Sequence, residues 1–134
     1  MPSSLEPEIL ITDRVLQPPL ERCSLRAGGV IEFFGVVRGE EDGKTISGID
    51  YQAHIIMARH QLIKVATEAC GKFELLGMIV HHRIGFVPAG EASLFLRVSA
   101  AHRHPAFEAA EWVIVQLKIR VPIWKHAVYS QQLQ

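Results

Sequence analysis

The chain has 134 residues, of which 49% are apolar and 21% charged, so it is long enough for one globular domain with a sizeable core. Its 14 basic and 14 acidic side chains balance, which excludes a global field that would draw the protein to nucleic acid or to a membrane surface. We expect a single domain over residues 1–134, in which any affinity for anions comes from a local cluster of cations.

Alternating or β-branched apolar runs predict six strands along the chain: residues 9–16, 30–37, 46–53, 75–84, 92–100 and 123–129. Helical spacing of apolar residues predicts one helix from Ile55 to Gly71 and a second that begins near His102 and ends before Pro122. The resulting order, β-β-β-α-β-β-α-β, favours the α+β class. We expect a mixed sheet with both long helices packed on one face.

The segments between these elements carry turn and loop signals. Residues 20–26 predict a single helical turn, residues 39–44 (G-E-E-D-G-K) a mobile loop, and residues 88–91 (P-A-G-E) a turn. The β-branched and aromatic run 30–37 is typical of a central strand. Within it, Gly35 indicates a bulge or a close backbone approach.

The two cysteines, Cys23 and Cys70, stand far apart and outside any C-x-x-C pair. This spacing predicts two reduced, buried thiols rather than a disulfide framework. The first residues, M-P-S-S-L-E-P-E, lack the basic and apolar regions of a signal peptide, and no apolar run approaches the length of a membrane span. We therefore expect a cytoplasmic protein without a membrane segment.

The second helix carries its charged residues at its two ends. The entrance holds His102, Arg103 and His104, and the exit holds Lys118, Arg120 and Lys125. The apolar middle, residues 107–117, is expected in the core. Cations in a last helical turn complement the negative end of the helix dipole, which is one explanation of Lys118. It does not explain Lys125, because Pro122 has already ended the helix.

Seven histidines raise the question of a metal site. His102 and His104 are spaced to share one face of a strand end, which favours chelation of zinc, and a small metal-dependent hydrolase built on them is one alternative. No acidic residue or cysteine stands at ligand spacing beside them, and adjacent His81 and His82 point to opposite faces of a strand. H-E-x-x-H, G-x-S-x-G and phosphate-loop motifs are absent, so we predict no metal site.

The remaining chemistry is cationic. Arg38 follows one predicted strand, His102 and Arg103 follow another, and Lys118 and Lys125 flank the proline break. Arginine grips phosphate or carboxylate with two parallel hydrogen bonds, and a lysine that loses its proton among other cations is a base or a nucleophile. Two interpretations are open: these side chains converge on an anionic substrate, or they are scattered, solvated surface cations.

Four segments make the sequence recognisable: F-F-G-V-V-R-G, H-R-I-G-x-V-P-x-G-E, S-A-A-H-R-H-P-A-F-E-A and L-K-I-R-V-P-I-W-K. In this order and spacing they closely resemble the large (catalytic) subunit of molybdopterin synthase, the MoaE family. The resemblance runs from about Ile9 to Lys125, nearly the whole chain. It implies an α+β hammerhead-like fold, in agreement with the predicted order of elements.

The resemblance also implies a sulfurtransferase that makes molybdopterin for molybdenum cofactor biosynthesis. Its partner would be a small ubiquitin-like sulfur-carrier subunit, whose Gly-Gly C-terminus carries sulfur as a thiocarboxylate. That sulfur would be transferred twice to cyclic pyranopterin monophosphate. The assembly would be a homodimer of catalytic subunits within a heterotetramer, and the reaction would need no metal or other cofactor.

Carried over residue by residue, the resemblance implies catalytic roles for Lys118, at the end of the inserted tail, and for Lys125, against the pterin. Six further residues would bind the substrate: Val36, Val37, Arg38, His102, Arg103 and His126. Aromatic residues would form the walls of the pocket: Phe33, Phe34, Phe107 and Trp124. The family usually has an acidic residue where this chain has Gln52, and a glutamate where it has Ala127. The alternative is therefore a non-catalytic relative that binds a ubiquitin-like tail or a pterin without turnover.

Overall fold

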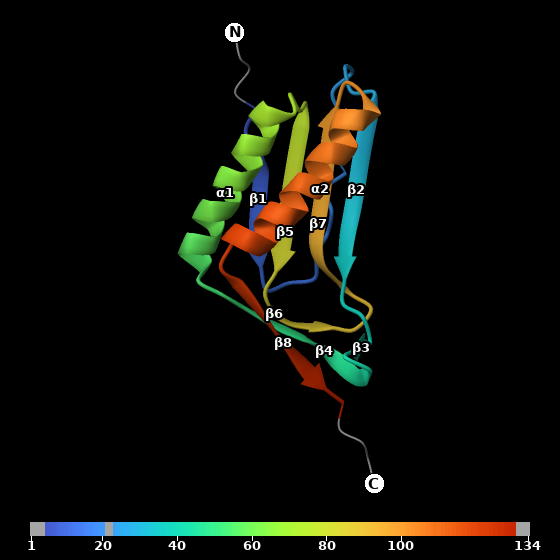
Figure 1. Ribbon diagram of the computed structural model, residues 1–134, viewed down its shortest axis with the longest axis vertical. Helices are drawn as coiled ribbons and strands as arrows, with labels where there is room; N and C mark the ends of the chain where they lie inside the picture. The colour runs from blue at the N-terminus through green and yellow to red at the C-terminus, as the bar shows by residue number, and fades with distance from the viewer. Residues whose placement is uncertain (1–4, 21–22, 131–134) are drawn as a thin grey trace.

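The computed structural model describes residues 5–20 and 23–130 (Figure 1). In chain order the elements are β1 (Glu8–Thr12), β2 (Gly29–Val36), β3 (Glu40–Glu41), β4 (Lys44–Ala53), α1 (Ile55–Lys72), β5 (Gly77–Arg83), β6 (Gly85–Pro88), β7 (Ala92–Ala100), α2 (Arg103–Arg120) and β8 (Ile123–Tyr129). Both predicted helices are present, and the predicted strands 92–100 and 123–129 have the predicted bounds.

The larger sheet has the strand order β1-β5-β7-β2. The β1–β5 pair is parallel and the other two pairs are antiparallel, so the sheet is mixed. Both helices lie side by side on one of its faces (Figure 1). The prediction of an α+β fold with two long helices on one face of a mixed sheet is confirmed.

The core lies between this sheet and the two helices. It contains Leu62 and Val65 from α1, Ala106, Ala109 and Val113 from α2, and Val80, Leu96 and Val98 from the central strands. The small alanines let the backbone of α2 approach the sheet closely. The prediction that the whole middle of α2 is buried is wrong, because Phe107 is 58% and Val115 43% exposed on its outer face.

A smaller sheet forms at one end of the larger one, where β4 pairs with β3, β6 and β8 (Figure 1). This arrangement corrects two predictions. The chain forms two sheets rather than one, and the residues predicted as a mobile loop form the β3–β4 hairpin. Its turn residues Asp42 and Gly43 both have positive φ, 50° and 76°. A two-residue turn of this type is what an Asp-Gly pair favours between antiparallel strands.

The apolar strand β2 lies at the edge of the larger sheet, not at its centre as predicted. Its side chains Val30, Phe34 and Val36 are exposed on the single chain, whereas Ile31 packs against the core. The irregularity expected at Gly35 is confirmed, since the register with β7 shifts between Gly35 and Val36. A side chain at Gly35 would place its Cβ 3.2 Å from the Cβ of Leu94.

The helical turn predicted for residues 20–26 includes residues 21–22, which lie outside the described part of the chain. In the remainder, the N–H of Ala27 donates to the carbonyl of Ser24 at 3.0 Å, which closes a turn and not a helix. Cys23 is exposed in this segment, so the prediction that both thiols are buried holds only for Cys70.

The different burial of the two thiols predicts different reactivity. Burial raises the pKa of the Cys70 thiol to about 11 and shields it from reagents, whereas Cys23 is exposed. We expect an aromatic disulfide reagent to modify one thiol per native chain at neutral pH, and two after unfolding in urea. Cys23→Ser should remove the native reaction and Cys70→Ser should leave it unchanged. Rapid modification of both thiols in the native protein would contradict this assignment.

Candidate active site

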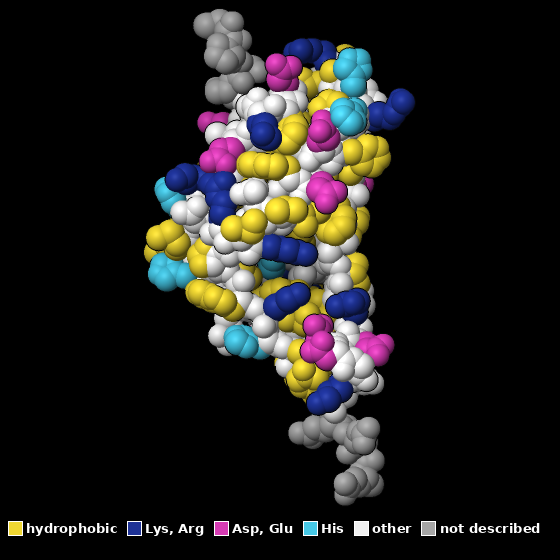
Figure 2. Space-filling model, in the orientation of Figure 1, with side chains coloured by type: hydrophobic (Ala, Val, Ile, Leu, Met, Phe, Trp, Pro, Cys, Tyr) yellow, Lys and Arg dark blue, Asp and Glu magenta, His cyan; other side chains and the backbone are white. Residues whose placement is uncertain are grey.

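An open cavity of about 450 Å³ lies where the two sheets meet beneath the end of α2. Its lining residues come from β2, β4, β5, β7, α2 and β8. Figure 2 shows Lys and Arg side chains gathered around a hollow at this junction. None of the described residues that line this cavity is a carboxylate, so the charge of this lining is that of Lys118 and Lys125.

The end of α2 brings these two lysines together. Lys118 lies in the last turn of the helix, which is capped where the N–H of Val121 donates to the carbonyl of Leu117 at 3.1 Å. Pro122 prevents the helix from continuing, and the chain turns into β8, on which Lys125 is the third residue. Because of this turn, both lysine side chains line the same cavity.

Tyr51 completes this side of the cavity from β4. It stands directly opposite Lys125 in the antiparallel β4–β8 pair, so the two side chains share a face of the smaller sheet. Its ring meets the ring of His82 edge-on, with centroids 5.3 Å apart and planes inclined at 75°. Tyr51 thus connects the smaller sheet, which carries Lys125, to the larger sheet, which carries His82.

His82 lies at the floor of the cavity and is only 5% exposed. As predicted, its neighbour His81 faces the other side of the sheet, where Nε2 lies 2.7 Å from a Glu8 oxygen. The carbonyl of Arg83 accepts a hydrogen bond of 2.8 Å from Nδ1 of His82. In the neutral ring this bond leaves Nε2 unprotonated, with a lone pair.

Burial lowers the pKa of His82, and the hydrogen bond to Arg83 opposes this shift only in part. The ring is therefore neutral at physiological pH. The sequence pattern did not single out His82 as a site residue. Its signals were the H-R-I-G segment and the strand alternation, which turns His82 and not His81 toward the helices.

Of the substrate-binding residues implied by the resemblance, Val36 lines the cavity. The backbone of Val37 is already engaged: its N–H donates to the carbonyl of Glu91 at 3.0 Å, and its carbonyl accepts from the N–H of Gly90 at 2.8 Å. Both backbone polar groups of Val37 are thus already hydrogen-bonded within the protein. Val36, which lines the cavity, is better placed than Val37 to contact a ligand there.

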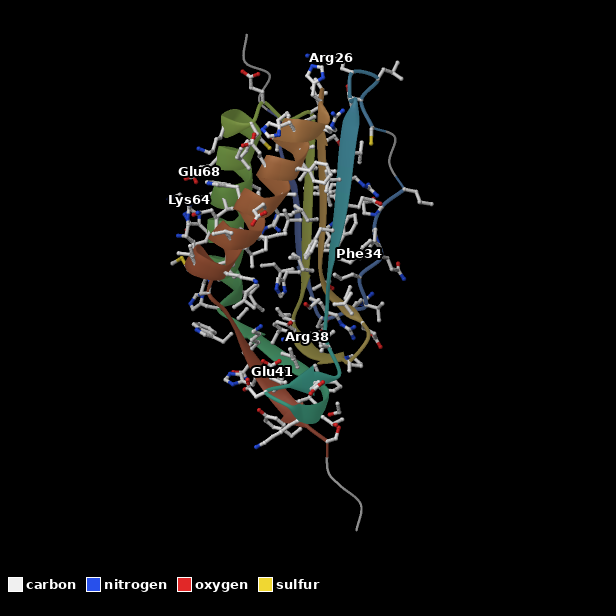
Figure 3. All side chains as sticks on the ribbon, turned by 45° about the vertical axis from the view of Figure 1, so that its right-hand side comes forward. Arg26, Phe34, Arg38, Glu41, Lys64 and Glu68 are labelled. Carbon is white, nitrogen blue, oxygen red and sulfur yellow. The ribbon has the colours of Figure 1, made fainter. Side chains whose placement is uncertain are left out.

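Arg38 lies just beyond β2, in a neighbouring depression formed with the β3–β4 hairpin. Figure 3 shows Arg38 and Glu41 together at the junction of the two sheets. Their side chains approach to 3.8 Å, and that of Arg38 is 79% exposed. A pair this open is weak and leaves the guanidinium free to turn toward a ligand.

His102 and Arg103 lie at the opposite end of α2 from the cavity. At the helical rise, Arg103 and Lys118 are about 22 Å apart along the axis. His126 stands opposite Asp50 on the β4–β8 ladder, so alternation turns it to the face away from Lys125. Within one chain the structure gathers Lys118, Lys125 and Val36, and places Arg38 nearby, but does not bring His102, Arg103 or His126 to the cavity.

The aromatic residues expected in the walls are exposed on the single chain, and Phe33 is the one that lines the cavity. Trp124 is 54% exposed on β8, and Phe34 packs on Phe95 with ring centroids 5.1 Å apart. Phe107 lies on the outer face of α2, beside Trp112. The sequence shows that these residues are apolar, but which face of each element is covered depends on tertiary packing.

The histidines considered for zinc lie at the exposed start of α2 rather than on a strand. His102 is the residue that precedes the helix, and Nε2 of His104 lies 3.2 Å from a carboxylate oxygen of Glu108. Within residues 5–20 and 23–130, no group of three or more His, Cys, Asp or Glu side chains is arranged to hold a metal ion. Neither described helix is long and apolar enough to cross a membrane.

Two lysines, a neutral histidine and a tyrosine line a cavity whose described lining contains no carboxylate, an arrangement that suits an anionic ligand. Comparison with known proteins specifies the class of protein. The chain belongs to the MoaE family, because the family model described as MoaE protein matches residues 11–120.

Named relatives agree with this assignment. The chain is 43% identical over 106 residues to the molybdopterin synthase catalytic subunit of Oryza sativa subsp. indica, which covers 79% of this chain and 55% of the rice protein. It is 37% identical over 108 residues to the Pyrococcus abyssi protein of the same name, covering 81% of this chain and 73% of that protein. This chain thus spans about half the length of the rice relative.

Two solved structures have the same fold. The molybdopterin synthase of Staphylococcus aureus superposes with a TM-score of 0.83 at 29% identity, over 95% of this chain and 93% of that one. A Helicobacter pylori structure, described as a complex of subunits 1 and 2 of molybdopterin-converting factor, superposes with a TM-score of 0.65 at 19% identity, over 93% and 90% of the two chains. The second likeness concerns the fold alone.

The lowered pKa of His82 predicts a loss of stability in acid. As the pH falls below the ordinary histidine pKa of 6.5, His82 binds a proton in the unfolded chain but not in the folded one. The free energy of unfolding contributed by this site therefore decreases as the pH falls through that value. We expect His82→Gln to lose less stability than wild type between about pH 7 and about pH 5 in urea unfolding. The exposed control His60→Gln should behave like wild type, and an unchanged slope in His82→Gln would contradict a buried neutral ring.

Proposed function

We propose that this chain is the catalytic subunit of a molybdopterin synthase and acts as a sulfurtransferase in the cytoplasm. It would transfer sulfur from the thiocarboxylated C-terminus of a small ubiquitin-like carrier to cyclic pyranopterin monophosphate. One observation carries the proposal: Lys118 and Lys125, the two lysines of the L-K-x-x-x-P-x-W-K segment, line a single cavity. Membership of the MoaE family supports it.

The cavity suits both substrates. A Gly-Gly tail is slender and its thiocarboxylate is an anion, so it favours an open cavity with cations at its edge. In the transfer, the carrier sulfur bonds to a carbon of the pterin side chain and the bond from that carbon to an oxygen breaks. The oxygen leaves with the electron pair of that bond and takes up a proton. Water then attacks the acyl carbon of the carrier and breaks its bond to sulfur. The carrier is left with a carboxylate, the pterin keeps the sulfur, and a proton is released.

The two lysines take different roles in this scheme. Lys118, at the end of α2, stabilises the negative charge that develops on the acyl oxygen when the carrier tail reacts. Lys125, on β8, holds the pterin or exchanges a proton with it. We assign Arg38 to the substrate phosphate, which its long and exposed side chain would bind after leaving Glu41.

His102 and Arg103 lie too far along α2 to reach the cavity of their own chain. If they hold substrate oxygens, they do so in the cavity of a second copy. We therefore include a homodimer in the proposal, with a carrier subunit at each cavity and a heterotetramer overall. That a protein with this fold was solved as a complex of subunits 1 and 2 of molybdopterin-converting factor is a precedent for the carrier.

The proposal predicts product formation that depends on both lysines. Purified protein, thiocarboxylated carrier and cyclic pyranopterin monophosphate should yield molybdopterin, measured after oxidation as a fluorescent pterin. Lys118→Ala and Lys125→Ala should each lose about a hundredfold or more of the rate, as expected when an acid–base or charge-stabilising group is removed. Lys64→Ala, an exposed lysine on α1, is the matched control and should react like wild type. Carrier binding without product from the wild type would favour the non-catalytic alternative.

The dimer predicts complementation between two inactive variants. Arg103→Ala removes a group supplied to the partner's cavity, and Lys118→Ala removes one from the chain's own cavity. A refolded equimolar mixture should contain mixed dimers with one intact cavity each, and recover roughly a quarter of wild-type activity by statistical pairing. Each variant alone should stay inactive. Mixed dimers observed by native mass spectrometry without recovery of activity would exclude this arrangement.

A further inference from the structure

The cavity contains a base that the proposed transfer leaves without a role. We propose that His82 is a catalytic residue of the release step, in which Nε2 removes a proton from the water that attacks the acyl carbon of the carrier. The inference rests on the proposed function and extends it. The release step needs a base, and the proposed scheme assigns that role to neither lysine.

The first argument is elimination among the lining groups. A water that attacks an acyl carbon must lose a proton, and the described lining of the cavity contains no carboxylate. The Ser93 hydroxyl donates to the carbonyl of Gly35 at 3.4 Å. The proposed scheme uses Lys118 as a cation toward the acyl oxygen and Lys125 toward the pterin. His82 is the remaining group that is both neutral and basic near physiological pH.

The second argument is geometry. The bond from Nδ1 to the carbonyl of Arg83 fixes the ring as the tautomer with a lone pair on Nε2. Nε2 has no hydrogen-bond partner among the described residues, and the ring lines the cavity. The edge-on contact with Tyr51 restricts rotation of the ring. A base held in this way needs no reorganisation before it reacts.

The third argument is the position of His82 in the sheet. It is paired with Ile11 of β1 and Leu94 of β7, near the end of β5, an inner strand of the larger sheet. The lysines, in contrast, carry long, exposed side chains at the end of α2 and near the start of β8. A rigid base opposite exposed lysine side chains is the arrangement expected when cations orient substrates against it.

The charges that face His82 determine where the abstracted proton goes. The cavity of His82 also contains Lys118 from α2 and Lys125 from β8, and Tyr51 faces the ring from β4. The residues paired with His82 on the flanking strands, Ile11 and Leu94, are apolar. An imidazolium beside two cations and no carboxylate is unstable, so it passes its proton on to solvent through the open cavity. In this step the water oxygen bonds to the acyl carbon, the carbon–sulfur bond breaks, and its electron pair stays on the pterin sulfur.

The test is a single-turnover reaction with wild type, His82→Gln and His81→Gln. Glutamine is close to histidine in size but cannot take up a proton, and His81→Gln is the matched control because its side chain faces the opposite side of the same strand. We expect His82→Gln to slow product release about a hundredfold and to accumulate the covalent carrier–pterin thioester, detected by mass spectrometry of the intact carrier. His81→Gln should show neither effect.

A second variant separates the chemical role from a structural one. In His82→Ala, added imidazole should fill the space and restore release, whereas it should not rescue Lys118→Ala. The inference is overturned if His82→Gln releases product as fast as His81→Gln, or if it is slow without accumulating thioester and His82→Ala is not rescued. Absence of product from wild type would instead overturn the proposed function, and this inference with it.

Discussion

The architecture depends on the break at Pro122. Because proline cannot continue α2, the chain leaves the helix and pairs as β8 along the length of β4. The carbonyl of Pro122 accepts a hydrogen bond of 3.3 Å from the N–H of His54, the residue that caps α1. One residue therefore ties the end of the second helix to the start of the first and to the smaller sheet. The cavity is the space left beneath this junction.

The two sheets contribute different kinds of group to that space. The larger sheet, covered by both helices, supplies the buried His82 from a central strand, while the smaller sheet supplies Tyr51 and Lys125 from strands with open faces. A bidentate contact of Arg120 with Glu68, at 2.6 and 3.2 Å, joins the two helices just before the break. The cations are thus presented by a well-anchored junction even though their own side chains are exposed.

Most of the fold could be predicted from the sequence, because alternation, helical spacing and proline or glycine breaks mark both helices and six strands. The strands that were missed, β3 and β6, are two and four residues long, too short for a periodic signal. The predicted position of β2 in the sheet was wrong because an apolar run has the same composition at an edge and in the centre.

For the candidate site, the sequence motifs identified Lys118 and Lys125. The motifs did not show that His102 and Arg103 lie far from the two lysines within one chain. The reason is that the 18-residue helix α2 separates its two ends. His82 was not singled out because its tautomer and environment depend on tertiary contacts.

The parallel pairing of β1 with β5 has a consequence for how the protein is made. Synthesis proceeds from the N-terminus, so β1 emerges from the ribosome well before its partner, and β2 must wait for β7. Neither strand has its neighbour in the larger sheet until the chain has been translated past α1, and β4 receives β8 last. Apolar strands without partners are targets for aggregation and for chaperones. Translation speed through the second half of the chain therefore sets how long the nascent strands stay unprotected.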